Sequence, residues 1–298
     1  PMILGDGEKA VTLSVDAGFT VSYMAKRSAD GTWSNVGTIT GTKINLIKRN
    51  PVDGKIYVGG TNVSNFGGVA TNGRAVYDPS TSTWAALGTG ASAGSNVTGI
   101  DFDASGNVYA VGTFTSMGGA ANSANIARWN ISTSTWTGLN SGLAGSSPYL
   151  ADVTVGVNGY VYVCGNFTSI NGVAASHVAY YNGSTWVTMG WAGSICLHIV
   201  SDKLGAIYMS HTGAPLVSYY FSGWGSTNWN SINAVYPPNS IEVAPQGGLY
   251  ASLDSLYYMR GTDEATFKKS ISAGPASTIS AIFFLKLSRI WVGGGIFF

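Results

Sequence analysis

Three observations predict an all-β fold, and more narrowly a six-bladed β-propeller of four-stranded antiparallel blades. Segments of similar sequence recur at intervals of roughly 50 residues, as in a repeat architecture. Each segment contains short runs rich in Val, Ile, Tyr and Trp, separated by Gly, Asn, Asp and Ser, which indicates short strands joined by tight turns. The chain also begins with the second half of a repeat and ends with the first half.

Each repeat is expected to contain four strands in a fixed order. The first strand ends in a hairpin turn, because Asp-Gly, Ser-Gly-Asn and Asn-Gly sequences tolerate the positive φ angles that tight turns require. An apolar second strand, a region with paired glycines, a third strand and a fourth strand carrying Trp follow. The three best-formed repeats have their first turns at residues 50–55, 103–107 and 156–160.

The second strands begin IYVGG, VYAVG and VYVCG in these repeats, and weaker versions follow as IYMSH, LYASL and IWVGG. The chain has six second-strand centres: Tyr57, Tyr109, Tyr162, Tyr208, Tyr250 and Trp291. It also has six fourth-strand aromatic residues: Trp33, Trp84, Trp136, Trp186, Trp229 and Phe267. The two sets are offset by half a repeat, so six units result only if the two ends of the chain combine.

Ring closure accounts for the half-repeats at the two ends. Residues 19–40 and 277–298 are predicted to contribute strands to one shared blade, which leaves no open sheet edge. Residues 1–18 are interpreted as an N-terminal extension or an outer strand. The whole chain, 1–298, would then be a single propeller domain whose other blades are residues 41–90, 91–142, 143–192, 193–233 and 234–276.

The recurrent glycines, tryptophans and cysteines have expected structural roles. Glycine has no side chain, so the paired glycines allow close approach of neighbouring backbones or sharp turns. Trp supplies a large apolar surface on which one blade can pack against the next. Cys164 and Cys196 lie on predicted inner strands, where two buried free thiols are expected and one disulfide between blades is the alternative.

Composition excludes several classes of function. Charged residues make up 10% of the chain and the formal net charge is +1, which excludes a strongly basic nucleic-acid surface. No stretch approaches the roughly 20 consecutive apolar residues of a membrane-spanning helix. The sequence therefore predicts no nucleic-acid partner and no membrane insertion.

The pattern YVGG-x-F-x-x-x-GG … A-x-[YW]-[DN]-x-S-T-W resembles the kelch and galactose-oxidase-like group of propeller repeats. It is most similar to the Gly- and Phe-rich variety seen in bacterial surface, tailed-phage and large-virus proteins, over residues 43–190. The resemblance implies a scaffold used mostly for binding or assembly. The group's oxidase branch holds copper with Tyr and His residues, but His177, His198 and His211 have no metal-ligand spacing here. No metal or cofactor is therefore expected.

Several carboxylates and one serine are candidate catalytic groups. The sequence DFDASGN at 101–107 looks superficially like a calcium loop, but a turn is the preferred interpretation. A glycosidase needs two carboxylates at a defined separation, and Asp152 is the acid expected to face the channel. Ser210 and His211 are adjacent, so on a strand they point to opposite faces. No catalytic residue is predicted.

The divergent repeats after residue 190 suggest a ligand-binding patch. They have lost the glycine pairs and gained aromatic and polar side chains. Such residues on propeller loops could stack on sugar rings, or they could merely fill the core between blades. The candidate ligand-binding residues are Trp191, His211, Tyr219, Trp224, Asp254 and Arg260, with Tyr220, Tyr257 and Tyr258 nearby.

These observations favour a non-enzymatic propeller outside a cell or on a virion, such as a phage tail. Its expected roles are adhesion, receptor or carbohydrate binding, or structural assembly. Its expected partners are other virion or cell-surface proteins and glycans. The alternative is a secreted carbohydrate-active or oxidase-like enzyme. Two or more acids clustered at the channel, or His with Tyr, would favour that enzyme.

Overall fold

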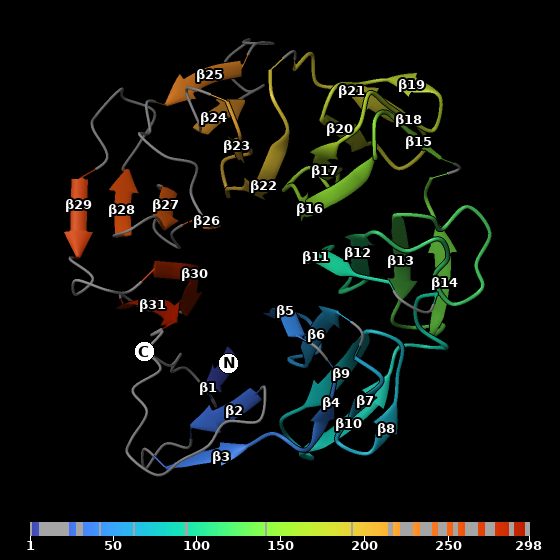
Figure 1. Cartoon of the computed structure of the whole chain (residues 1–298), viewed down its shortest axis with the longest axis vertical. Helices are drawn as coiled ribbons and strands as arrows, with labels where there is room; N and C mark the ends of the chain where they lie inside the picture. Colours follow the sequence, from blue (N-terminus) through green and yellow to red (C-terminus); the bar gives the residue numbers. More distant parts are fainter. Residues whose placement is uncertain are drawn as a thin grey trace.

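The computed structural model shows strands and turns in every part of the chain that it describes (Figure 1). No helix in those ranges could cross a membrane. The described residues are 2–5, 24–27, 32–41, 43–61, 63–92, 95–140, 142–191, 193–213, 217–220, 229–232, 240–243, 249–252, 256–259, 268–271, 278–285 and 289–295.

Five antiparallel sheets of four strands, blades 1 to 5, form the body of the described structure. Blade 1 contains β5 (Lys43–Arg49), β6 (Ile56–Thr61), β9 (Arg74–Asp78) and β10 (Thr83–Ala86). Blade 2 contains β11 (Val97–Phe102), β12 (Val108–Gly112), β13 (Ile126–Asn130) and β14 (Thr135–Gly138). Blade 3 contains β16 (Tyr149–Val155), β17 (Val161–Asn166), β20 (Val178–Tyr181) and β21 (Trp186–Thr188).

The later blades repeat this plan. Blade 4 contains β22 (Cys196–Ser201), β23 (Ile207–His211), β24 (Val217–Tyr220) and β25 (Trp229–Ile232). Blade 5 contains β26 (Ser240–Val243), β27 (Leu249–Ser252), β28 (Leu256–Met259) and β29 (Lys268–Ile271). Figure 1 shows the sheets around a common centre, with β5, β11, β16, β22 and β26 innermost and β10, β14, β21, β25 and β29 outermost. The prediction of an all-β, propeller-like fold is confirmed.

Small outer sheets fill the connection between second and third strands in two places. One joins β4 (Ile39–Thr40), β7 (Asn65–Phe66) and β8 (Val69–Ala70). The other joins β15 (Leu143–Ala144), β18 (Ser169–Ile170) and β19 (Val173–Ala174). The predicted glycine-containing turns are the tips of these hairpins, at residues 67–68 and 171–172.

The two ends of the chain, which were predicted to share one blade, form two separate sheets among the described residues. β30 (Thr278–Leu285) and β31 (Arg289–Gly295) form a two-stranded sheet, with β30 packed on β26 and β27. β2 (Met24–Arg27) pairs with β3 (Trp33–Asn35) on one edge and, in parallel, with β1 (Met2–Gly5) on the other. β1 thus occupies the edge of β2 that a shared blade would offer to β31. The sequence assigned no inner partner to residues 1–18 and therefore missed this pairing.

A β-bulge recurs in the inner strand of most blades. The register shifts by one residue between Ile44 and Leu46 in β5, Val97 and Gly99 in β11, Leu150 and Asp152 in β16, and Cys196 and His198 in β22. A bulge increases local twist and redirects side chains, and bulges are common beside active sites. The inner strands therefore present their side chains to the centre in the same way.

In blades 1 to 4 the fourth-strand Trp joins its blade to the sheet before it. In all four described cases the indole N–H donates to a backbone carbonyl of the preceding sheet, and the acceptor lies three residues after that sheet's own Trp. The pairs are Trp84 to Val36 (3.1 Å), Trp136 to Leu87 (2.9 Å), Trp186 to Leu139 (2.7 Å) and Trp229 to Met189 (3.0 Å). Packing and hydrogen bonding by one residue type thus set the spacing of the blades.

The first glycine of each pair makes room for this Trp. A Cβ on Gly67 would lie 2.2 Å from Cδ1 of Trp84, and one on Gly118 would lie 2.5 Å from Cδ1 of Trp136. A Cβ on the second glycine, Gly119, would meet nothing within 4 Å. The glycine pair is therefore two different constraints, one of space and one of turn conformation.

Candidate functional site

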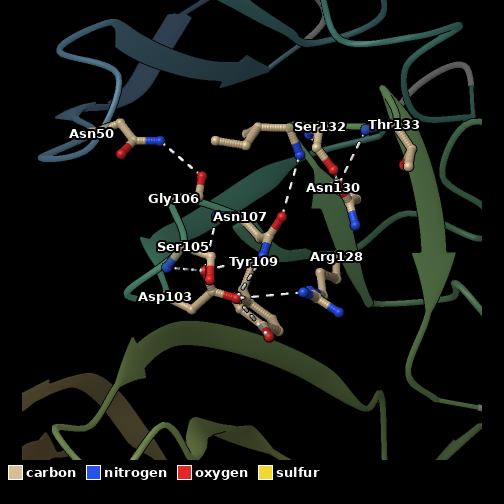
Figure 2. Close-up of polar contacts among 11 residues, drawn as sticks. Asn50, Asp103, Ser105, Gly106, Asn107, Tyr109, Arg128, Asn130, Ser132 and Thr133 are labelled. Carbon is tan, nitrogen blue, oxygen red and sulfur yellow. Dashed lines mark hydrogen bonds and ion pairs between the residues drawn. The ribbon is translucent and has the colours of Figure 1, made fainter.

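The calcium-like sequence at 101–107 includes the hairpin turn between β11 and β12 (Figure 2). The Asp103 carboxylate accepts hydrogen bonds from the backbone N–H groups of Ser105 (3.0 Å) and Asn107 (2.9 Å) and from Nδ2 of Asn107 (2.9 Å). The Tyr109 hydroxyl donates to it at 3.4 Å, and Nη2 of Arg128 lies at 3.6 Å. Both carboxylate oxygens are engaged within the hairpin, so this segment is a hydrogen-bonded turn.

The same hydrogen bond between a second-strand Tyr and a turn Asp recurs in blades 1 and 4, whereas in blade 3 Nδ2 of Asn158 donates to the Tyr162 hydroxyl at 2.9 Å. The hydroxyls of Tyr57 and Tyr208 donate to the carboxylates of Asp53 (2.9 Å) and Asp202 (3.3 Å). Burial raises the pKa of Tyr57 and Tyr208 above the ordinary value, and it raises the pKa of Tyr109 to about 12. These tyrosines stay neutral, and their hydroxyls stabilise the hairpin turns by hydrogen bonds to the turn aspartates. Within the described ranges, no three His, Cys, Asp or Glu side chains are grouped so that they could hold a metal ion.

Four side chains on consecutive inner strands form an inner-strand belt: Lys48, Asp101, Thr154 and Ser201. Nζ of Lys48 lies 2.7 Å from Oδ1 of Asp101. Oδ2 of Asp101 accepts the N–H of Val155 (2.7 Å) and the hydroxyl of Thr154 (3.1 Å). Thr154 Oγ1 then accepts the N–H of Ser201 at 3.2 Å. The belt ties β5, β11, β16 and β22 together around the centre.

A second polar contact, the His198–Asp152 pair, joins blades 3 and 4 at their inner strands. Nδ1 of His198 lies 3.7 Å from Oδ2 of Asp152, and their side chains are 35% and 21% exposed. The Asp152 carboxylate is oriented by two backbone N–H groups, of Val153 (2.8 Å to Oδ1) and Ile199 (3.2 Å to Oδ2). A Cβ at Gly99 would lie 2.7 Å from Oδ1 of Asp152, so glycine in β11 leaves space for this carboxylate.

This arrangement is suited to proton transfer. A carboxylate facing Nδ1 favours the tautomer with hydrogen on Nδ1 and leaves Nε2 as a base, which is the logic of His–carboxylate pairs in hydrolases. The 3.7 Å separation is longer than a hydrogen bond, as catalytic contacts often are before substrate binds. Asp152 and Thr154 are two residues apart on β16, so they share a face, and Asp101 contacts Thr154.

Sequence reasoning placed Asp152 and His198 on inner strands but did not pair them. It missed the belt altogether, although Lys48, Asp101 and Thr154 stand one repeat apart at the same register, each opposite a second-strand Tyr. A polar residue recurring within an otherwise apolar inner strand is the signal that could have identified the belt.

The predicted ligand-binding residues divide into three groups. The rings of Trp191 and His211 lie 4.7 Å apart, and His211 is buried with its ring nitrogens near Ser218 (3.0 Å) and Ser194 (3.4 Å). Tyr219 packs against a different apolar cluster, beside Tyr208. Trp224, Asp254 and Arg260 lie outside the described residues, as do the side chains of Tyr257 and Tyr258. The assignment of a ligand to this set stays a prediction.

The two cysteines are free and fully buried, on β17 and β22. Burial raises the pKa of both thiols above the ordinary value, so they are protonated and unreactive at neutral pH. The prediction of two buried free thiols is confirmed for the described structure.

No protein-family model matches this chain, and no curated protein matches it either. Solved structures do resemble it. The extracellular domain of a hybrid two-component system of B. thetaiotaomicron is 16% identical with a TM-score of 0.61; the match covers 86% of this chain and 32% of that one. This chain thus spans about a third of that sensor domain.

Two enzymes are also similar in structure. A catalytically inactive His-to-Ala variant of virginiamycin B lyase from Staphylococcus aureus, with quinupristin, is 12% identical with a TM-score of 0.62, over 89% of this chain and 82% of that one. A gluconolactonase from Xanthomonas campestris is 14% identical with a TM-score of 0.57, over 86% and 84%. At such identities the likeness shows the β-propeller fold alone.

These comparisons correct the expected function. A non-enzymatic virion, phage-tail or adhesion module was predicted, but the structures that resemble this chain include propeller enzymes and extracellular sensor domains, and they give no evidence of such a role. The kelch-like, phage-specific type that the repeat motifs suggested gains no support from them. The motifs gave the wrong function because the glycine pairs and the Trp latches, the indole hydrogen bonds from one blade to the preceding sheet, stabilise blades and carry no information about a ligand.

Proposed function

We propose that this chain is a propeller enzyme that cleaves a carbon–oxygen bond of an ester or lactone by acid–base catalysis. The His198–Asp152 pair carries the proposal. It joins two inner strands, remains partly exposed, and has its carboxylate fixed by two backbone N–H groups. Proton transfer by a positioned His typically contributes about 10²- to 10⁴-fold in rate.

The roles of the residues follow from the contacts. Asp152 orients the imidazole, and His198 takes a proton from water or substrate through Nε2 and gives it to the oxygen released when the carbon–oxygen bond breaks. The inner-strand belt holds β16 and β22 in place and keeps the cation of Lys48 near the centre, 2.7 Å from Asp101. A virginiamycin B lyase, whose His-to-Ala variant is catalytically inactive, and a gluconolactonase are among the similar structures, which supports the proposal.

The test is turnover of gluconolactone and quinupristin by wild type, His198→Gln and Asp152→Asn. Both variants should lower kcat/KM by about 10²-fold or more. The matched control is His177→Asn: His177 lies away from the inner strands, with Nδ1 3.2 Å from the Gly165 carbonyl. Asn suits its positive φ of 65°. No turnover by wild type, or unchanged turnover in His198→Gln, would contradict the proposal.

We also propose an extracellular location, because two of the similar structures are extracellular domains. Fractionation of the source cells tests this: protein found only in the cytoplasm would exclude it. The predicted cell-surface and glycan partners stay predictions.

We further propose that the ring has six blades. Trp33 stands in the repeat where the latch tryptophans stand, since Val36, three residues later, accepts the bond from Trp84. The same spacing makes the Ser270 carbonyl in β29, three residues after Phe267, its expected acceptor.

A further inference from the structure

A cavity of about 370 Å³ lies on the rim, between the N-terminal sheet and blade 1. Its walls come from β2, β3, the β7–β8 turn and β10; Figure 1 places β3 and β10 toward the outside of the ring. The side chains that matter are Lys26, Asn35, Ser82, Thr83 and Trp84, over a floor that includes Gly67. The volume is within the range of small-molecule sites, about 300–1,000 Å³.

The charge of this cavity is positive. Lys26 is its only cationic wall residue and none of the described wall residues is acidic. Nζ of Lys26 lies 3.4 Å from the Ser82 hydroxyl, and no carboxylate of the described residues lies within ion-pair distance. An ammonium group with hydroxyl and amide neighbours suits a ligand that has both a carboxylate and hydroxyl groups.

The equivalent position in blade 2 shows what is different here. Lys26 precedes the residue paired with Trp33, and Arg128 likewise precedes the residue paired with Trp136. Arg128 forms an ion pair with Asp103, 3.6 Å away, and its guanidinium lies over the Tyr109 ring. The same register position thus carries a cation paired with a carboxylate within blade 2 and, at the cavity, a cation that no carboxylate of the described residues pairs.

The walls are built to stay open. The Trp84 indole is fixed by its bond to Val36 and by the rings of Phe66 and Tyr77, about 5 Å away. A Cβ on Gly67 would clash with Cδ1 of Trp84 at 2.2 Å, and one on Gly37 would lie 3.0 Å from the Cα of Gly67. Trp136 and Trp186, the equivalent tryptophans, are 9% and 4% exposed, whereas Trp84 is only partly buried.

We propose that this rim cavity binds a sugar acid of monosaccharide size. The carboxylate pairs with Nζ of Lys26, and the ring hydroxyls bind the polar side chains of Asn35, Ser82 and Thr83. The apolar edge of Trp84 excludes water beside the sugar. The site is separate from the His198–Asp152 pair, so it stands whether or not that pair is catalytic.

Isothermal titration calorimetry of the full chain with galacturonate tests the proposal, with galactose and acetate as comparison ligands. Galacturonate should bind at millimolar or lower concentration. Galactose, which lacks the charge, and acetate, which lacks the ring, should each bind at least about tenfold more weakly. Equal binding of galactose or of acetate, or no heat with galacturonate, would overturn the assignment.

Variants locate the binding. Lys26→Gln should weaken galacturonate binding about tenfold or more, and Lys26→Arg should retain it, because the charge remains. Lys55→Gln is the matched control, since Lys55 lies in the same region but pairs with Asp78 (3.4 Å) and does not line the cavity. Wild-type affinity in Lys26→Gln would refute the site. If that variant misfolds, the galacturonate-to-galactose ratio of the wild type still decides.

Discussion

The hairpin turns and the inner strands of this propeller use the same residue type, aspartate, in opposite ways. Asp103 in a hairpin accepts bonds from Ser105, Asn107 and Tyr109, all within seven residues of sequence. Asp152 on an inner strand accepts two backbone N–H groups and faces His198 of the next blade, whose side chain is 35% exposed. The Asp103 carboxylate is hydrogen-bonded within its own hairpin. The Asp152 carboxylate is held in position beside a His side chain of the next blade.

The difference teaches where function can reside in a repeat protein. Among the described residues, the Tyr–Asp hydrogen bonds recur in blades 1, 2 and 4 and the Trp hydrogen bonds in blades 1 to 4, so they report the fold. The His198–Asp152 pair occurs once among the described inner strands, although each of those strands offers the same register position. Substitutions at the hairpin turns and at the Trp contacts should therefore lower stability strongly, whereas substitutions at the His198–Asp152 pair should affect turnover first.

The largest expected effect is at the glycine pair of blade 2. Gly118→Ala should lower the free energy of unfolding by about 3 kcal/mol or more, because its Cβ would lie 2.5 Å from Trp136 and its φ is +60°. Gly119→Ala, with open space around its Cβ, should cost about 1 kcal/mol. Urea unfolding of both variants measures this. Equal losses would show that the Trp136 contact is unimportant.

The Trp latch should rank second. Trp186→Phe keeps an aromatic ring but removes the 2.7 Å bond to the Leu139 carbonyl, which should cost about 1–3 kcal/mol by thermal or urea unfolding. Trp33→Phe tests ring closure with the same change. A similar loss supports a sixth latch onto blade 5, and wild-type stability in Trp33→Phe would rule out closure through this contact.

The smallest effect concerns His211. Burial lowers its pKa below the ordinary 6.5. The unfolded chain then binds a proton near pH 6.5 that the folded state resists, so stability is complete above that pH and declines as pH falls below it. His211→Asn should flatten the decline in melting temperature between pH 7.5 and pH 5. Parallel curves for wild type and variant would assign the decline to other groups.

The sequence by itself determined the local structure of this protein. Hairpin turns, second strands and fourth-strand tryptophans depend on neighbouring residues and on a repeat that is visible in one dimension, and the described strands follow them. The tertiary structure decided which edges pair at the chain ends, where β1 takes the edge of β2. It also decided that Asp152 meets His198 and that Lys26 lines a cavity to which the described residues contribute no carboxylate. Those contacts join residues of different repeats, and their geometry depends on how bulged and twisted sheets pack around the centre, which no pattern within a single repeat contains.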